Sequence, residues 1–301
     1  MIRIVTDSVA SIPVDLQERH HIDVLTLHVN YKGVEHKDAE MDLDAFYQDI
    51  YDMADNPPVS SQPSQHELET YFENAAQAGD EVLGVWISSH LSGTYEGAIR
   101  AAKAVKERYP DFVFAMIDST STGLDEGIPV LEGASAIEEG SDLKQAVQAV
   151  LDGIMRTRFL FVPESLTFLQ KGGRIGGAAA FIGNLIKLTP ILTVRNGEAT
   201  GIAKARTMKK ALAKILEIMQ EDAKEHGGLA RLAVHYIGSK APALAWAREH
   251  VEPLVDQEVC VLPVSPVIGV HVGPAIGIVY ECRTKIEGKY TQSISDLVCV
   301  G

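Results

Sequence analysis

Cysteine and long hydrophobic runs are scarce in this sequence. Cys260, Cys282 and Cys299 are too few and too far apart for a disulfide framework or a zinc site, and no C-x-x-C pair occurs. No uninterrupted apolar stretch reaches membrane-spanning length, and residues 1–7 are typical of a strand, not of a signal peptide. These absences predict reduced thiols in a cytoplasmic protein with no metal site and no integral membrane segment.

Basic residues are in the minority. Lysine and arginine together number 27 against 41 aspartates and glutamates, which gives a formal net charge of −14. Because a nucleic-acid-binding protein needs a basic face for the phosphate backbone, this balance argues against general nucleic-acid binding. A small anion is still compatible with the composition, since one local pocket can oppose the charge of the whole molecule.

Three catalytic and nucleotide-binding fingerprints are also missing. Neither G-x-G-x-x-G nor the P-loop pattern G-x-x-x-x-G-K-[ST] occurs, so the chain shows no nucleotide-phosphate site of its own. The G-x-S-x-G elbow of serine hydrolases does not occur either.

The 301 residues, 46% of them apolar, are enough for one large or two ordinary α/β domains. The first half alternates strands and helices, which predicts a mainly parallel sheet with helices on both faces. The second half combines strand–helix units with a hairpin whose turn is Asn196-Gly197, which favours a mixed sheet with helices. We expect an N-terminal domain over 1–156, a C-terminal domain over 157–282 and a C-terminal extension, a tail or an added strand, over 283–301.

Capping residues and apolar patterns give the expected elements. Ser64 and Glu67 match a capping box at the start of one helix. The expected helices cover 13–20, 43–53, 65–78, 94–108, 125–139, 141–156, 165–173, 177–188, 207–226 and 241–251. The expected strands cover 2–5, 23–31, 81–88, 112–118, 158–163, 190–205 as a hairpin, 231–238, 259–264 and 275–282.

Hydroxyl groups and a glycine gather where one strand gives way to a helix, in "ISSHLSGTYEGA" from Ile87 to Ala98. Ligands of open α/β sheets collect at the carboxyl ends of strands, where the free N–H groups of a helix start favour an anion. Gly93 would let the backbone approach such an anion, and Ser92 would add a donor. A plain N-cap is the alternative, but it needs only one hydroxyl, so the additional Ser88 and Ser89 favour an anion site.

Two further stretches offer polar groups to a ligand. In "VSSQPSQHE", Ser64 is the expected cap, which leaves Ser60 and Ser61 for a ligand unless the segment is an ordinary polar loop. In "SPVIGVHVGPAIG", His271 is expected near the end of an apolar strand beside a turn, where a ring N–H could reach a ligand. The alternative is a core histidine with satisfied hydrogen bonds.

Lys171 and Arg174 flank two glycines in "LQKGGRIGG". One interpretation is a solvated helix C-terminus, where the cations oppose the helix dipole. The other is an exposed arginine offered to a charged partner or a phosphate group.

Taken in order, these motifs resemble the DegV family, whose members include the fatty-acid-binding subunits of bacterial fatty acid kinase. The resemblance spans about residues 2–281. It depends on "TDS" at 6–8, "SSQPS" at 60–64, "SSHLSGTYEGA" from 88, "DSTSTG" at 118–123, "KGGRI" at 171–175, "KART" at 204–207 and "IGVHVGP" at 268–274. The chain departs from the family where Ser60 replaces the usual threonine and Ala275 replaces a glycine. A turn that needed positive φ at Ala275 would be strained.

The resemblance implies two α/β domains with a long-chain fatty acid bound between them. By analogy, hydroxyl groups of the "SQPS" and "LSG" motifs hold the carboxylate, with the histidine nearby. The corresponding residues here are Ser60 or Ser61, Ser92, Gly93 and His271. The family arginine, here Arg174, is implicated in work with the kinase partner.

The expected function is therefore to bind a long-chain fatty acid and present its carboxylate to the catalytic subunit of a fatty acid kinase. That separate, ATP-dependent enzyme would form the acyl phosphate, so this chain would need no catalytic residue and no cofactor. One alternative is a serine-type acyl hydrolase that pairs a serine with His271, although no acid can be assigned to orient that histidine. Another is a binding protein for a different small carboxylate.

A fatty-acid tail also needs an apolar tunnel, because each buried CH₂ contributes roughly 0.8 kcal/mol. For most of the candidate wall residues, a place in the ordinary core is the simpler interpretation. The candidates are Phe159, Phe161, Phe168, Phe181, Ile182, Leu185, Ile186, Ile191 and Leu192.

Overall fold

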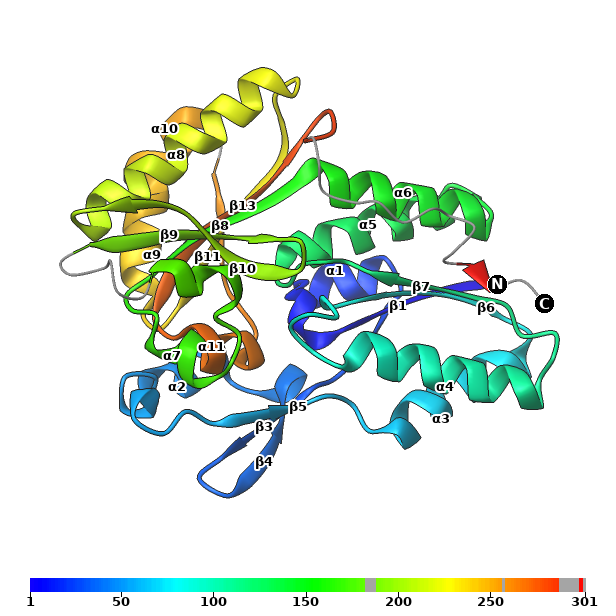
Figure 1. The fold of residues 1–301 in the computed structure, drawn as a ribbon. Helices are drawn as coiled ribbons and strands as arrows, with labels where there is room; N and C mark the ends of the chain where they lie inside the picture. Colours follow the sequence, from blue (N-terminus) through cyan, green and yellow to red (C-terminus); the bar gives the residue numbers. More distant parts are fainter. Residues whose placement is uncertain (182–187, 256–257, 287–297, 300–301) are drawn as a thin grey trace.

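The computed structural model describes residues 1–181, 188–255, 258–286 and 298–299, which form two large sheets and one small one (Figure 1). The N-terminal sheet has the order β14-β7-β6-β1-β2. Its inner strands pair in parallel, which confirms the mainly parallel sheet, and β14 pairs antiparallel at the edge. The strands are β1 (Ile2–Asp7), β2 (Ile22–Leu25), β6 (Glu81–Trp86), β7 (Phe114–Asp118) and β14 (Val298–Cys299).

Helices cover both faces of this sheet, as its buried strands require. Figure 1 shows α3 and α4 on one face and α5 and α6 on the other. The predicted capping box at Ser64 and Glu67 is present at the start of α3. The helices are α1 (Val14–Arg19), α3 (Gln65–Ala78), α4 (Thr94–Arg108), α5 (Leu124–Glu138) and α6 (Leu143–Arg156).

The strand expected over 23–31 is divided between two sheets. After β2, the backbone of Leu27 bonds the Ser8 hydroxyl and the Asp38 amide, so the chain turns away from the first sheet. The rest becomes β3 (His28–Tyr31), which pairs with β4 (Val34–Lys37) and β5 (Val59–Ser61) in the small sheet. The connecting segment contains α2 (Leu43–Gln48) and two short 3₁₀ turns, Asp38–Glu40 and Asp52–Ala54.

The C-terminal sheet has the order β10-β9-β8-β13-β11-β12 and is mixed, because only β11 and β12 pair in parallel. Asn196 and Gly197 both have positive φ, as the predicted type I′ hairpin turn requires. The strands are β8 (Thr157–Pro163), β9 (Thr189–Arg195), β10 (Glu198–Ala205), β11 (Leu229–Ile237), β12 (Cys260–Pro263) and β13 (Ala275–Cys282).

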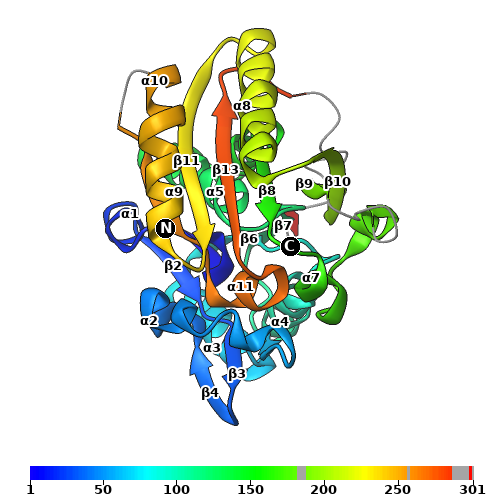
Figure 2. The same cartoon turned by 90° about the vertical axis from the view of Figure 1, so that its left-hand side faces the viewer.

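The two large sheets share one hydrophobic core. On the outer face of the C-terminal sheet, α8 (Met208–Glu225) and α9 (Lys240–Trp246) run alongside β11 and β13 (Figure 2). A π-helical turn, Ala247–Val251, and α10 (Glu252–Val255) follow α9. On the inner face, Phe159 and Val279 belong to the same buried cluster as Leu83 and Val150 of the N-terminal half.

His271 lies on a helix, so the expected strand there is wrong. The helix α11 (Pro266–Val272) begins where Ser265 accepts a hydrogen bond from the amide of Val267. The buried Asp38 also accepts from this amide and from the Ser265 hydroxyl, and proline is favourable at a helix start. These capping interactions outweigh the β-branched residues of the segment.

Ala275 is not strained. The positive φ of this turn, 72°, belongs to Gly273, and Ala275 simply begins β13. The glycine that the turn needs is therefore present two residues earlier.

Only the first part of the apolar helix expected over 177–188 can be compared with the structure. The described residues form α7 (Thr167–Lys171) and a 3₁₀ helix over Gly176–Phe181. Positions 182–187 lie outside the described residues, and with them three of the predicted tunnel residues: Ile182, Leu185 and Ile186.

The C-terminal extension returns toward the N-terminal sheet. The amide of Ile286 donates to the Met155 carbonyl of α6, and Lys285 pairs with Asp152 at 2.7 Å. The strand β14 then adds to the edge of the N-terminal sheet beside β7. None of the helices within the described ranges is long and apolar enough to cross a membrane.

Candidate ligand-binding site between the two large sheets

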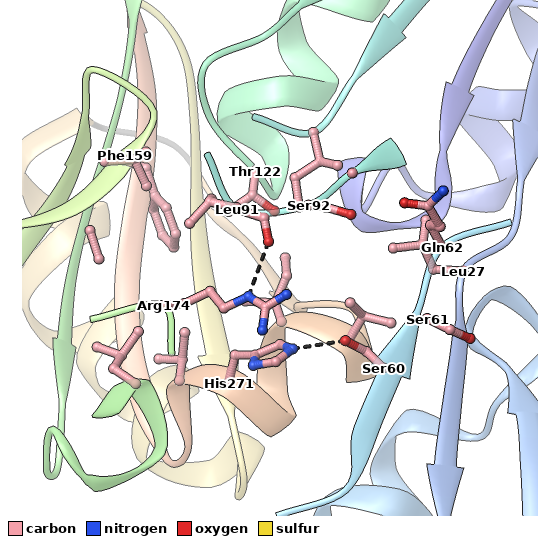
Figure 3. A pocket seen from close by; sticks show the side chains of 18 of the residues that line it. Leu27, Ser60, Ser61, Gln62, Leu91, Ser92, Thr122, Phe159, Arg174 and His271 are labelled. Atoms are coloured by element: carbon pink, nitrogen blue, oxygen red, sulfur yellow. Dashed lines mark hydrogen bonds between the residues drawn. The ribbon is translucent and has the colours of Figure 1, made fainter. Parts of the chain in front are cut away.

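A cavity of about 310 Å³ lies between the loops of the N-terminal half and the inner face of the C-terminal sheet (Figure 3). One side of its lining is polar and the other is apolar. The polar side includes Ser60, Ser61, Gln62, Ser92, Thr122, Arg174 and His271. The apolar side includes Leu91, Phe159, Phe161, Leu169, Val194, Ala199, Ile268 and Val272.

Six of the residues predicted from the sequence to contact the ligand or the kinase partner line this one cavity, although they come from four separate segments. Two serines belong to β5, the "LSG" pair precedes α4, the histidine is on α11, and the arginine follows α7. The residues are Ser60, Ser61, Ser92, Gly93, His271 and Arg174.

His271 lines the cavity and pairs with Ser60. Its Nε2 lies 2.8 Å from the Ser60 hydroxyl, whereas the buried Nδ1 has no hydrogen-bond partner among the described residues. Burial, and then the charge of Arg174, lower the pKa of His271 to about 4. The ring is therefore neutral near pH 7, and the tautomer decides whether Nε2 or the Ser60 hydroxyl is the donor of this pair.

Gly172 is required beside this ring. A Cβ at Gly172 would lie 2.4 Å from Nδ1 of His271, so any other residue would displace the imidazole. One glycine of the "KGG" motif therefore makes room for the histidine.

Ser92 and Gly93 form the start of α4. The hydroxyl of Ser92 lies 2.8 Å from the Thr94 hydroxyl and accepts weakly from the Thr94 amide. Gly93 provides space, because a Cβ there would meet the amide oxygen of Gln62 at 2.6 Å. Ser92 thus has a local capping role and also faces the cavity.

The other two hydroxyls of this serine-rich stretch bond to the protein itself. Ser88 is fully buried and donates to the Gly197 carbonyl at 2.9 Å, and Ser89 donates to Asp118 at 2.6 Å. Counting serines therefore overestimated the donors for an anion. Ser88 instead fastens the β9–β10 hairpin to the N-terminal half.

Arg174 is half-buried and faces the cavity, unlike the exposed arginine that one interpretation of the sequence favours. Its Nε donates to the Leu91 carbonyl at 3.1 Å, and its Nη1 donates to the Gly172 carbonyl at 2.7 Å. Lys171 donates to the carbonyls of Ala54 and Asp55. The "KGGR" corner is therefore fastened to the N-terminal half at two places.

Two of the predicted tunnel residues form the apolar wall of this cavity. The rings of Phe159 and Phe161 stack with their centroids 5.1 Å apart. Gly277 permits this, because a Cβ there would lie 2.9 Å from Cε2 of Phe159 and 2.9 Å from Cβ of Phe161. The remaining described candidates, Phe168, Phe181, Ile191 and Leu192, do not line the cavity.

Thr122 is a cavity residue that the sequence analysis did not single out. It is 6% exposed, and its hydroxyl has no hydrogen-bond partner in the described part of the chain. The available signal was the "DSTSTG" motif, which places hydroxyl groups between the end of β7 and the start of α5. That is the same kind of position as the "LSG" motif.

The Ser60–His271 pair lacks the third member of a serine-hydrolase triad. A triad needs an acid bonded to the second imidazole nitrogen, and no described residue bonds Nδ1 of His271. The arrangement is suited to binding an anionic head group beside an apolar chain.

A family model described as "Uncharacterised protein, DegV family" matches residues 1–283. The chain belongs to the DegV family. It is 39% identical over 280 residues to a DegV domain-containing protein of Clostridium perfringens, covering 93% of this chain and 98% of that one. The DegV match ends before the last part of the extension, which includes β14.

Solved DegV structures share the fold. A DegV family protein from Thermus thermophilus, described by its fatty acid binding, is 30% identical with a TM-score of 0.80, over 93% of this chain and 99% of that one. DegV from Bacillus subtilis, described as a fatty acid binding protein, is 30% identical with a TM-score of 0.81, over 93% and 99%. A stearic acid-binding protein from Eubacterium ventriosum is 25% identical with a TM-score of 0.86, over 94% and 99%.

Proposed function

We propose that this DegV protein binds a long-chain fatty acid in the cavity between its two large sheets. The carboxylate lies toward Ser60, Ser92 and His271, and the tail lies along Phe159 and Phe161. The observation that carries the proposal is the division of one cavity into a polar side, which includes the Ser60–His271 pair, and an apolar side. The fatty acids bound by similar DegV proteins support it.

The cavity can balance the charge of a carboxylate despite the net charge of −14. Arg174 places a guanidinium beside the polar side, and the neutral His271 offers a hydrogen bond without a second charge. The tail supplies most of the binding free energy, because each buried CH₂ contributes roughly 0.8 kcal/mol. The polar groups then determine the orientation of the ligand.

We further propose that the bound carboxylate is the substrate of a separate ATP-dependent kinase. An oxygen of the carboxylate attacks the terminal phosphorus of ATP, the bond from that phosphorus to the bridging oxygen breaks, and ADP leaves. The product is an acyl phosphate. The absence of a P-loop from the sequence supports this division of labour, in which this chain holds the acid and a partner holds the nucleotide.

Lipid extraction tests the binding step. Mass spectrometry of lipid extracted from the purified, denatured protein should detect a long-chain fatty acid, and calorimetry should show uptake by delipidated protein. Absence of lipid together with absence of uptake would refute the proposal. Labelling of Ser60 by a covalent serine-hydrolase probe would instead favour the hydrolase alternative.

The kinase step is tested with Arg174→Ala. We expect this variant to retain fatty acid, because the tail supplies most of the binding free energy. It should form less acyl phosphate with purified kinase and ATP at saturating lipid, since a guanidinium can pair with phosphate oxygens. Arg174→Lys should restore part of the rate. If lipid binding falls and the rate at saturating lipid does not, Arg174 acts only in the pocket and the proposed role with the kinase is wrong.

A further inference from the structure

Gln62 is a cavity residue to which the proposed function assigns no role. Its side chain is half-buried, and its amide has no hydrogen-bond partner among the described residues. Neither amide atom belongs to the fully buried polar atoms that lack a partner, so both atoms have accessible surface. Other polar groups of the cavity are engaged: the Ser60 hydroxyl pairs with His271, and Arg174 donates to two backbone carbonyls. The amide of Gln62 is therefore available to a ligand.

The position of Gln62 is fixed by the residues on either side of it. Ser61 ends β5, which pairs with β3, and Ser64 caps the start of α3. The buried Pro63 lies between Gln62 and this cap, and a proline disfavours a helical backbone at the residue before it. The backbone of Gln62 is therefore held between a strand and a helix start, and its side chain extends toward α4.

Two glycines at the start of α4 make room for the amide of Gln62. A Cβ at Gly93 would lie 2.6 Å from its Oε1, and a Cβ at Gly97 would lie 3.0 Å from its Nε2. Gly97 lies inside the helix, where glycine is less favourable than alanine, and it lacks the positive φ that would require a glycine. The space that Gln62 occupies therefore explains this glycine.

These contacts place the amide at the head-group end of the cavity. Gly93 follows Ser92, toward which the proposed carboxylate lies, and it is the N-cap of α4 without a side-chain hydrogen bond of its own. Figure 3 shows Ser92 between Gln62 and Phe159 of the apolar wall. The amide therefore adjoins a helix start, where a negative charge is favourable.

We propose that Gln62 is a further head-group residue: an N–H of its amide donates a hydrogen bond to the ionised carboxylate of the bound fatty acid. The inference rests on the proposed fatty-acid binding and adds a residue that favours one charge state of the acid. Because no hydrogen bond to the described residues holds the amide in one orientation, a half-turn can bring Nε2 beside Gly93. A donor to the charged form stabilises that form, which is also the form that would attack ATP.

Palmitic acid labelled with ¹³C in its carboxyl group tests the inference, because the NMR chemical shift of that carbon reports the ionisation of the bound acid. Gln62→Met removes the donor at a similar volume. We expect palmitate affinity at pH 8, measured by calorimetry, to fall about ten-fold and the pKa of the bound acid to rise by about 1, since both changes measure one lost hydrogen bond to the charged form. Gln62→Glu brings a second carboxylate to the head group and should raise this pKa further.

Gln65→Glu is the matched control. Gln65 is exposed and bonds Glu69, so the same substitution there adds the same charge outside the cavity, and it should change neither the affinity nor the pKa of the bound acid. The charged or titratable residues near the head group are Arg174 and His271 of the cavity lining and Arg100 beside Gly97. They are the same in every variant, so their effect on this pKa is common to all.

Three results would overturn the inference while leaving fatty-acid binding intact. One is a fall in affinity in Gln62→Met with no change in the pKa of the bound acid, which would show that Gln62 only shapes the cavity. Another is wild-type affinity and pKa in both Gln62 variants. The third is an equal rise of the pKa in Gln65→Glu, which would attribute the effect to charge at a distance. Failure of the wild-type protein to bind palmitate would instead refute the proposed function itself.

Discussion

At the scale of single residues, the cavity combines one permanent cation with one neutral imidazole. Burial alone would keep His271 neutral, and the guanidinium of Arg174 strengthens the effect because two cations side by side repel each other. The cavity therefore gains a hydrogen-bond donor without adding charge. One positive charge is also what a single carboxylate requires.

This coupling predicts that Arg174→Ala raises the pKa of His271, which lies at about 4 in the wild-type protein. Removal of the neighbouring cation makes protonation of the ring easier. An NMR titration of the imidazole protons of delipidated protein measures the change. Lys171→Ala is the control: that side chain bonds the carbonyls of Ala54 and Asp55, and it should leave the titration unchanged. The coupling is refuted if the two variants titrate alike.

At the scale of secondary-structure elements, short sequence motifs correctly predicted the helix start and the hairpin turn that depend on neighbouring residues alone. The capping box at Ser64 and the Asn196-Gly197 turn are each decided by a few adjacent residues, and both are present. The helix that carries His271 was missed because its start is stabilised by Asp38, more than 220 residues away in the sequence. No pattern around His271 reveals that carboxylate.

The same limit applies to the candidate site. Its polar residues could be found because each lies in a recognisable motif, but their hydrogen bonds could not. Whether Ser88 bonds a ligand or the Gly197 carbonyl depends on where the hairpin of the other sheet docks. Likewise, an unpaired hydroxyl at Thr122 is visible only once the surrounding groups are placed.

Asp38→Ala tests the remote cap of α11. The buried Asp38 accepts from the Ser265 hydroxyl and the Val267 amide, so its loss removes the acceptor of the hydroxyl and leaves the amide with only its 3.2 Å bond to Ser265. We expect the free energy of unfolding to fall by roughly 2–4 kcal/mol in urea denaturation, and fatty-acid affinity to fall because α11 carries His271. The control is Asp42→Ala, which removes the cap of α2 at an exposed site and should cost about 1 kcal/mol. If the free energy of unfolding falls equally in the two variants, the buried cap of α11 is worth no more than the exposed cap of α2, and this prediction is wrong.

At the scale of the whole molecule, charged and polar contacts join helices of the N-terminal half to strands of the C-terminal sheet. Arg156 of α6 bonds Glu132 of α5 and Glu281 of β13, and Arg231 of β11 bonds the same two carboxylates. His235 adds a hydrogen bond between the halves: its Nε2, on β11, accepts from the Leu124 amide in the first turn of α5. We expect the two halves to unfold together for this reason.

The hydrogen bond between His235 and the Leu124 amide should make the free energy of unfolding depend on pH. Burial lowers the pKa of His235 from its ordinary value of 6.5 to about 4, so the unfolded chain binds this proton more readily than the folded one. The contribution of His235 is therefore complete above about pH 6.5 and is lost as the pH falls toward 4, by up to roughly 3 kcal/mol. Asp7 opposes this trend, because burial raises its pKa to about 7 and the folded state then binds the proton more tightly.

His235→Gln separates the two effects. Glutamine can still accept from the Leu124 amide but does not titrate, so the contribution of Asp7 is common to both proteins and cancels in their difference. Urea denaturation at a series of pH values should show that wild-type stability falls more than that of the variant between pH 6.5 and 4. The variant itself should be less stable at pH 7, because it loses the edge-on contact with Phe159. If the free energy of unfolding has the same pH profile in the two proteins, His235 has the same pKa in the folded and unfolded chains. The predicted contribution of His235 to the pH dependence would then be wrong.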